Sequence, residues 1–113
     1  MRLQSHIWVS AFLRKEQADG GWAAITRKGS PEAGAIFISQ NHLDGTWSLY
    51  APLPQALAAE EVGVGRSFEC VIKSAGEDAV QAYLERQIRF DSDCWIVETE
   101  RRTGMPSFVG ADS

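Results

Sequence analysis

The chain has 113 residues, of which 44% are hydrophobic and 23% charged, and this balance is typical of a folded domain rather than a disordered chain. Its formal net charge of -4 argues against a protein that binds nucleic acid, because such binding needs an excess of Lys and Arg to displace counterions from phosphate. No stretch is apolar over the roughly 20 residues that span a bilayer, so we expect no contact with a membrane.

The two cysteines, Cys70 and Cys94, stand far apart and belong to no CxxC motif and no Cys/His cluster. This usage is typical of buried thiols in a reducing compartment, and we expect a cytoplasmic protein. The apolar run at residues 7–13 does not predict a signal peptide. It is interrupted by Ser10 and followed by charged residues where a cleavage site would have small ones.

Residues 5–19 predict the first helix, with Ser5 as its N-cap and Gly20-Gly21 as its C-terminal stop. A strand over residues 6–13 is the alternative, because apolar residues there also alternate. The Lys15 to Asp19 segment favours the helix, since it is a poor strand. The residues that would form the apolar helical face are Trp8, Val9, Ala11, Phe12 and Leu13.

Residues 35–51 predict a β-hairpin, because strand-forming runs flank the pair Asp44-Gly45. Two loops fit this pattern. In one, Leu43-Asp44-Gly45 is a three-residue loop with Gly45 in the left-handed region, and in the other the turn is Asp44-Gly45 alone. The two loops imply different registers, and the sequence leaves both open.

Further strands are expected over residues 22–28, 66–73 and 94–101, and a second helix over 77–90. Pro52-Leu53-Pro54 ends the hairpin, and residues 55–61 could form a short helix. Strict alternation in the 66–73 strand would put three side chains on one face, those of Phe68, Cys70 and Ile72. The apolar stripe of the second helix consists of Val80, Tyr83, Leu84 and Ile88.

The order helix, strand, hairpin, strand, helix, strand predicts an α+β fold with a small mixed or mostly antiparallel sheet and two main helices packed on one face. The strand-helix-strand unit over residues 66–101 is a candidate parallel crossover. We expect a single α+β domain over residues 1–102 and a flexible C-terminal tail over 103–113, which has little periodicity.

The most site-like segment is Arg27-Lys28-Gly29-Ser30, in which two cations precede a turn whose backbone N–H groups could bind an anion. The alternative is a strand that ends in solubilising charge. His42 and Asp44 could share a proton or ligate a metal, but a metal site needs three or four ligands. The simpler interpretation gives Asp44 a role in the turn and places His42 at a strand end.

Glu98 and Glu100 lie two residues apart in the last strand and therefore face the same side. Paired carboxylates can divide the roles of acid and base in an enzyme, but solvent-facing carboxylates at a strand end produce the same pattern. Cys94 has no nearby base that would make it a nucleophile. The chain contains no G-x-S-x-G, G-x-G-x-x-G or Walker A motif. We therefore predict no catalytic residue, no metal and no cofactor.

The leading hypothesis is a non-enzymatic module that binds a protein partner, or a second copy of itself as a homodimer, through the sheet face or edge around the hairpin. The alternative is a small-anion or metabolite-binding protein, or a minor enzyme, that uses the Arg27 to Ser30 turn, with Arg27, Lys28 and Ser30 as ligand-binding residues. His42 and Asp44 are the other ligand-binding candidates.

Three segments of the chain resemble a small proteobacterial family, domain of unknown function 1491, over about residues 2–101: SHIWVSAFLRKEQADGGWAAITRKGSPEAGAIF, NHLDGTWSLYAPLPQAL and QAYLERQIRFDSDCWIVETE. The motifs that carry the resemblance are Arg27-Lys28-Gly29 leading to Ala33-Gly34, Leu43-Asp44-Gly45-Thr46 with Tyr50 and Pro52, and Arg89-Phe90-Asp91 before Trp95. Family members usually carry Arg where Lys28 stands and Asp where Ser30 stands. The resemblance implies a cytosolic stand-alone module, and it supplies no activity, substrate or catalytic residue.

Overall fold

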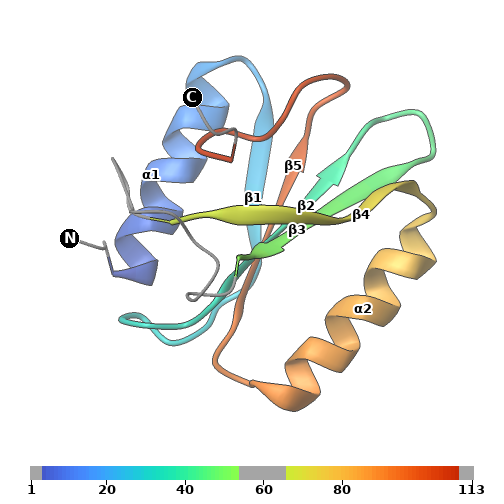
Figure 1. The fold of residues 1–113 in the computed structure, drawn as a ribbon. Coiled ribbons are helices and arrows are strands. Elements are labelled where there is room, and N and C mark those ends of the chain that lie inside the picture. Colours follow the sequence, from blue (N-terminus) through green and yellow to red (C-terminus); the bar gives the residue numbers. More distant parts are fainter. Residues whose placement is uncertain (1–3, 54–65, 110–113) are drawn as a thin grey trace.

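The computed structural model describes residues 4–53 and 66–109, which form two helices and one five-stranded sheet (Figure 1). This confirms the predicted α+β class. The short helix expected over residues 55–61 lies outside the described residues. The elements in chain order are α1 (Ser5–Ala18), β1 (Trp22–Arg27), β2 (Ile36–Asn41), β3 (Trp47–Pro52), β4 (Phe68–Ala75), α2 (Glu77–Phe90) and β5 (Trp95–Glu100).

The strands lie in the order β1-β5-β2-β3-β4 and form a mixed sheet, as predicted. β5 runs parallel to β2, and the other neighbouring pairs are antiparallel. β4 and β5 therefore run in the same direction, and α2 joins them as a parallel crossover. The crossover inserts β5, the last strand in the sequence, between β1 and β2.

The two helices pack on opposite faces of the sheet. Ile36 and Ile38 of β2 pack with Trp8 of α1, whereas Phe37 between them packs with Leu84 of α2. The α1-side core contains Trp8, Val9, Phe12, Ala23, Ile36, Ile38, Tyr50, Trp95 and Val97. The α2-side core contains Phe37, Trp47, Leu49, Ala51, Val80, Leu84, Cys94 and Ile96.

The expectation that both helices share one face of the sheet is therefore wrong. The physical reason lies in β2, whose first five residues are all buried. A strand with apolar side chains on both faces needs a cover on each side, and the run Ile36-Phe37-Ile38 indicates this two-sided burial. Figure 1 shows α1 beside β1 and α2 along the opposite side of the sheet.

Helix α1 forms as predicted, but Ser5 is its first helical residue and Gln4 occupies the N-cap position. The buried Ser5 hydroxyl donates to the Gly34 carbonyl at 2.6 Å and accepts from Arg66 Nη2 at 3.0 Å. Ser5 therefore fastens the start of the helix to the segment before β2, because its hydroxyl is used in long-range contacts rather than on a helical N–H group.

Strand β4 does not alternate as expected. Tyr50 pairs with Cys70 and Leu49 with Ile72, so Val71 is an extra residue in a β-bulge. Because the bulge shifts the phase, Val71 and Ile72 both pack against the α2-side core. Phe68, before the bulge, packs against the α1-side core.

The two cysteines differ in exposure. Cys94, directly before β5, is buried as predicted, whereas Cys70 is exposed beside the bulge, so the prediction that both are buried is wrong for Cys70. Both are free thiols. No helix in the described residues is long and apolar enough to cross a membrane.

The segment after β5 packs against α1 as far as Val109, although a flexible tail was expected from Thr103. Pro106 and Ser107 are buried, and the Phe108 ring meets the Trp8 ring edge-on at a centroid distance of 5.8 Å. The buried carboxylate of Glu16 anchors this segment. Three side chains donate to it, namely Thr99 Oγ1 at 2.6 Å, Ser107 Oγ at 2.7 Å and Arg101 Nη2 at 2.9 Å.

Candidate functional site

The two clusters of predicted site residues lie at opposite ends of the sheet. Arg27 ends β1 and pairs with Ile96 near the start of β5, whereas His42 directly follows β2. A strand of six residues such as β2 spans roughly 20 Å. The structure therefore does not bring the Arg27 to Ser30 turn together with His42 and Asp44.

The Arg27 to Ser30 turn packs closely against the segment that leads into β5. Arg27 Nη2 donates to the Ser92 carbonyl at 2.8 Å, and the Ser30 N–H donates to the Asp93 carbonyl at 2.9 Å. A Cβ on Gly29 would overlap the Asp93 carbonyl oxygen, so this close approach requires glycine. These two donors are used within the protein, and Lys28 alone among the four residues is exposed.

His42 and Asp44 build the hairpin. His42 Nε2 shares a hydrogen bond with Ser48 Oγ at 2.8 Å, and the Ser48 oxygen also accepts the Ser74 N–H at 3.0 Å. Ser48 is buried, and its hydroxyl is used in these two contacts within the sheet. Asp44 Oδ1 accepts from the hydroxyl of Thr46 at 2.6 Å and from its N–H at 2.9 Å, and these bonds hold the pKa of Asp44 below its usual value.

The Cys94 thiol also lacks the accessibility that a nucleophile needs. Cys94 is buried, and burial raises the pKa of its thiol, so the nucleophilic thiolate is disfavoured. Within residues 4–53 and 66–109, no group of three or more His, Cys, Asp or Glu side chains could hold a metal ion.

The hairpin loop has three residues, which decides between the two registers. The His42 N–H donates to the Thr46 carbonyl at 3.0 Å, and Gly45 has φ 90°. Leu43 is also in the left-handed region, with φ 63°, where a bulky side chain is strained. Its N–H donates to Asn41 Oδ1 at 2.9 Å, and its carbonyl accepts from Arg102 Nη1 at 3.3 Å. Both ends of the strained residue are therefore held in place.

Three exposed apolar side chains belong to segments that lie at this end of the sheet. Trp22 begins β1, Leu43 lies in the hairpin loop and Met105 follows β5, and their exposed fractions are 47%, 42% and 57%. Gln40 Nε2 donates to the carbonyls of Arg101 and Gly104 at 2.9 and 3.0 Å, which fixes the Met105 segment beside the end of β2. We call the surface formed by Trp22, Leu43, Arg102 and Met105 the hairpin-end surface.

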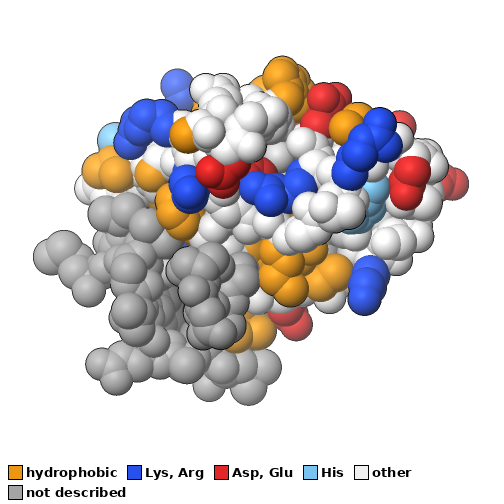
Figure 2. Space-filling model, turned by 90° about the horizontal axis from the view of Figure 1, so that it is seen from above, with side chains coloured by type: hydrophobic (Ala, Val, Ile, Leu, Met, Phe, Trp, Pro, Cys, Tyr) orange, Lys and Arg blue, Asp and Glu red, His pale blue; other side chains and the backbone are white. Residues whose placement is uncertain are grey.

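Figure 2 looks down on this end of the molecule, where apolar side chains lie among Lys, Arg, Asp and Glu side chains. The mixture is typical of the rim and core of a protein interface. Sequence reasoning named Leu43 only as a loop residue. The signal that could have singled it out is the Asp44-Gly45 turn itself, because the three-residue alternative gives Leu43 a place in the loop.

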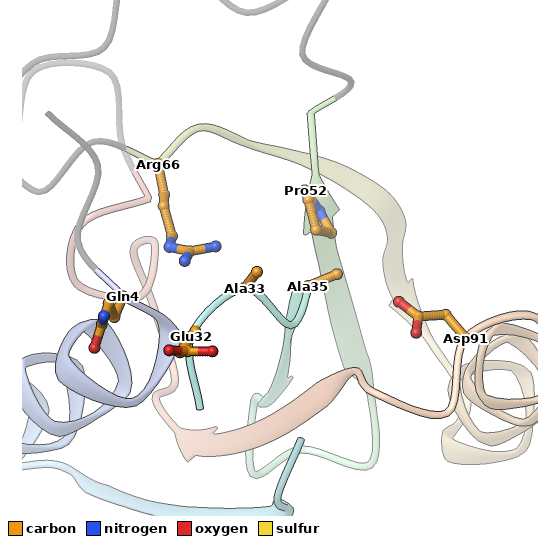
Figure 3. Close-up of a pocket in the computed structure, with 7 residues that line it drawn as sticks. All are labelled: Gln4, Glu32, Ala33, Ala35, Pro52, Arg66 and Asp91. Atoms are coloured by element: carbon orange, nitrogen blue, oxygen red, sulfur yellow. The ribbon is translucent and has the colours of Figure 1, made fainter. Parts of the chain in front are cut away.

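A pocket of about 300 Å³ opens at the opposite end of the sheet (Figure 3). Arg66 faces Gln4 and Glu32 on one side, Asp91 stands on the other, and Ala33, Ala35 and Pro52 lie between them. Its volume is at the lower limit for small-molecule sites. None of the predicted site residues lines it, and its walls come from segments that sequence reasoning had no means of bringing together.

Comparisons with known proteins agree with the fold. A family model described as a protein of unknown function, DUF1491, matches residues 3–109. The chain belongs to this family. The solution structure of protein Atu0922 from A. tumefaciens is 44% identical with a TM-score of 0.78, and the match covers 93% of this chain and 89% of that one.

A crystal structure of a DUF1491 family protein from Caulobacter crescentus CB15 is 32% identical with a TM-score of 0.76, and the match covers 94% of this chain and 92% of that chain. A comparison with curated proteins finds no match. The family description assigns no activity, so these comparisons establish the family and the fold alone.

Proposed function

We propose that this chain is a non-enzymatic protein-binding or self-associating module, and that it docks through the hairpin-end surface. The observation that carries the proposal is Leu43, a bulky apolar residue held in the left-handed region with its side chain 42% exposed. Such strain costs on the order of 1–3 kcal/mol, and it is concentrated where a protein binds or reacts.

The chemistry of the surface supports docking. Trp, Met and Arg are enriched in the cores of protein interfaces, and the hairpin-end surface contains one of each beside Leu43. A partner that buries the Leu43 side chain would gain up to about 1.5–3 kcal/mol from that contact. The hydrogen bonds at the Leu43 N–H and carbonyl hold the residue in its docking geometry before binding, which lowers the entropic cost of association.

We place this module in the cytoplasm. The support is the cysteine usage: Cys70 is exposed as a free thiol, and Cys94 is buried away from it. An exposed unpaired thiol is compatible with a compartment that keeps thiols reduced.

The alternative function is an anion or metabolite site at the Arg27 to Ser30 turn. The Arg27 guanidinium and the Ser30 N–H already donate to backbone carbonyls of the segment before β5. An anion would have to compete with these bonds, and the protein-docking proposal needs no such rearrangement.

The test compares three tagged proteins expressed in native cells at the natural level: wild type, Leu43→Ser and Ile7→Ser. Ile7 is the matched control, because it is 43% exposed but lies in α1, away from the hairpin. Each is purified, its associated proteins are quantified by mass spectrometry, and its solution mass is measured.

We expect a stoichiometric partner, or a dimer, with wild type and with Ile7→Ser, and its loss with Leu43→Ser. If all three proteins retain the partner or the dimer equally, the docking surface lies elsewhere on the protein. A monomer without a partner in all three would overturn the proposed function.

A further inference from the structure

An exposed tryptophan and two carboxylates share one patch of sheet face beside the hairpin-end surface. In the register of β1 and β5, Trp22 pairs with Glu100 and Ala24 pairs with Glu98. Paired residues on neighbouring strands point to the same side of a sheet. The Trp22 indole therefore lies next to the Glu100 side chain, and Glu98 follows two residues along the same face.

This patch is on the side of the sheet that α2 covers only in part. Ala23 belongs to the α1-side core and Ile96 to the α2-side core, so Trp22, Glu98 and Glu100 point toward the α2 side. Helix α2 packs mainly over β3 and β4. The face over β1 and β5 stays accessible as a result, with Trp22 exposed and both carboxylates half-buried.

The carboxylates on this face are not paired with a positive charge within residues 4–53 and 66–109. Among the residues that the structure describes, no Lys, Arg or His nitrogen lies within 4.0 Å of the Glu98 or Glu100 carboxylate. Burial, together with the nearby charges of Glu100 and Glu77, raises the pKa of Glu98. The patch is therefore a half-buried site of uncompensated negative charge.

A buried hydroxyl beside Glu98 also lacks a partner in the part of the chain that the structure describes. Ser39 pairs with Glu98 in the parallel register of β2 and β5, and it points to the same α2 side as Phe37. It is 3% exposed, and its Oγ makes no hydrogen bond within residues 4–53 and 66–109. Since neighbouring strands lie about 4.8 Å apart, a group with several N–H donors that reaches Glu98 can also reach this hydroxyl.

We propose that this acidic face, Trp22 with Glu98, Glu100 and Ser39, receives an arginine side chain of the docked protein partner. The proposal rests on the proposed function, because the arginine belongs to the partner that covers the hairpin-end surface. Trp22 belongs to both surfaces and joins them into one interface.

The guanidinium group matches the patch in charge and in shape. Its planar fork of five donors suits two adjacent carboxylates and a hydroxyl acceptor, and its flat face stacks on an indole ring. A bare metal ion matches less well, because in the described ranges no set of three ligating side chains is close enough to hold one.

The experiment is an NMR titration of the 15N-labelled protein with the pentapeptide Gly-Arg-Gly-Arg-Gly. The control probe has citrulline in place of each arginine, which keeps the shape of the side chain and removes its charge. The indole N–H signal of Trp22 is assigned with the Trp22→Phe variant. We expect it to shift with the arginine peptide together with the backbone amides of residues 98–100, and to stay unchanged with the citrulline peptide.

Variants then test the carboxylates. We expect Glu98→Gln/Glu100→Gln to weaken binding of the arginine peptide by roughly tenfold or more, since both charges that attract the guanidinium are lost. The matched control is Glu69→Gln/Glu85→Gln, which removes two exposed carboxylates on β4 and α2 and should leave the affinity unchanged. Equal binding of both peptides, or no shift at Trp22, would overturn the proposal.

The same variants separate this inference from the proposed function. If the partner is lost with Leu43→Ser but kept with Glu98→Gln/Glu100→Gln, docking at the hairpin end stands and the arginine site fails. If the arginine peptide binds as expected while Leu43→Ser keeps every partner, the arginine site stands and the hairpin-end docking fails.

Discussion

Glu16→Gln is the substitution that should reveal most about how the C-terminal segment is held. The Glu16 carboxylate is buried beneath that segment and accepts hydrogen bonds from the side chains of Thr99, Arg101 and Ser107. A glutamine amide keeps the size of the side chain but replaces one acceptor oxygen with a donor. The amide oxygen can replace Oε2, which accepts from Arg101 and Ser107, or Oε1, which accepts from Thr99, so the three contacts cannot all be kept.

The size of the effect follows from those contacts. A hydrogen bond to a charged group contributes about 1.5–3 kcal/mol, and breaking a buried ion pair costs about 3–5 kcal/mol. The Arg101 side chain is 28% exposed, so water replaces part of what the guanidinium loses. We therefore expect Glu16→Gln to lower the free energy of unfolding by about 2–3 kcal/mol, which corresponds to roughly 10 °C in Tm for a domain of this size.

The pH dependence of this loss identifies its cause. Burial alone would raise the pKa of Glu16, but the hydrogen bonds from Arg101, Thr99 and Ser107 outweigh it and hold the pKa below its ordinary value. The folded state therefore binds this proton more weakly than the unfolded state does. The stabilisation is complete above the unfolded pKa of about 4.3 and disappears as the pH falls through the folded value.

Urea unfolding followed by tryptophan fluorescence at a series of pH values from 7 down to 3 measures this difference. Glu85→Gln, an exposed carboxylate on α2, serves as the control and should match wild type throughout. If Glu16→Gln lowers the free energy of unfolding by less than about 0.5 kcal/mol at pH 7, the Glu16 carboxylate contributes no more than an ordinary surface carboxylate and the reasoning is refuted. A loss that stays constant down to pH 3 would show that shape rather than charge is responsible.

Three further predictions concern single positions. Gly29→Ala should lower the free energy of unfolding, measured in urea, by more than about 3 kcal/mol, because the added Cβ would overlap the Asp93 carbonyl. The control Gly20→Ala has open space around the added Cβ and φ +88°, and should lower it by only about 1 kcal/mol; equal losses would contradict the close approach at Gly29. Leu43→Gly should raise Tm, because glycine adopts the left-handed conformation without strain. The free energy of unfolding should rise by about 0.5–1 kcal/mol after the conformational entropy of glycine is subtracted, and an unchanged or lower Tm would show that the loop is not strained. Glu98→Gln should stabilise the protein at pH 7, because burial and the neighbouring carboxylates raise the pKa of Glu98 in the folded state. The stability of wild type therefore falls as the pH rises from the unfolded pKa of about 4.3 through the folded pKa. In urea titrations the gain in stability of Glu98→Gln should vanish below that pH range, and a gain of the same size at pH 3 would refute the electrostatic cause.

The sequence predicted the features that depend on neighbouring residues. Both helices, the hairpin and the five strands follow from local periodicity and turn residues, and all are present. The side of the sheet that the second helix covers does not follow from local periodicity, because it depends on the burial of both faces of β2 at Ile36-Phe37-Ile38. The bulge at Val71 has no local signal, since alternation through that strand reads as regular until β3 and β4 are paired.

The candidate site was predicted less well, because it depends on pairing between distant strands. The sequence places Glu98 and Glu100 on one side of a strand, but only the β1–β5 register adds Trp22 and only the β2–β5 register adds Ser39. Glu16 reads as a solvated residue between Lys15 and Gln17. Its buried role appears when the segment after β5 returns to α1, more than eighty positions later in the chain.

The central place of β5 has a consequence for how the chain folds during synthesis. β1 and β2 do not touch each other in the finished sheet, since β5 lies between them. Until residue 100 has left the ribosome, the hairpin formed by β2 and β3 must therefore wait with the β2 edge unpaired. An unpaired apolar edge of this kind is a target for chaperones and for aggregation. A ribosome-bound nascent chain arrested before β5 should thus be far more sensitive to proteolysis than one arrested well beyond it.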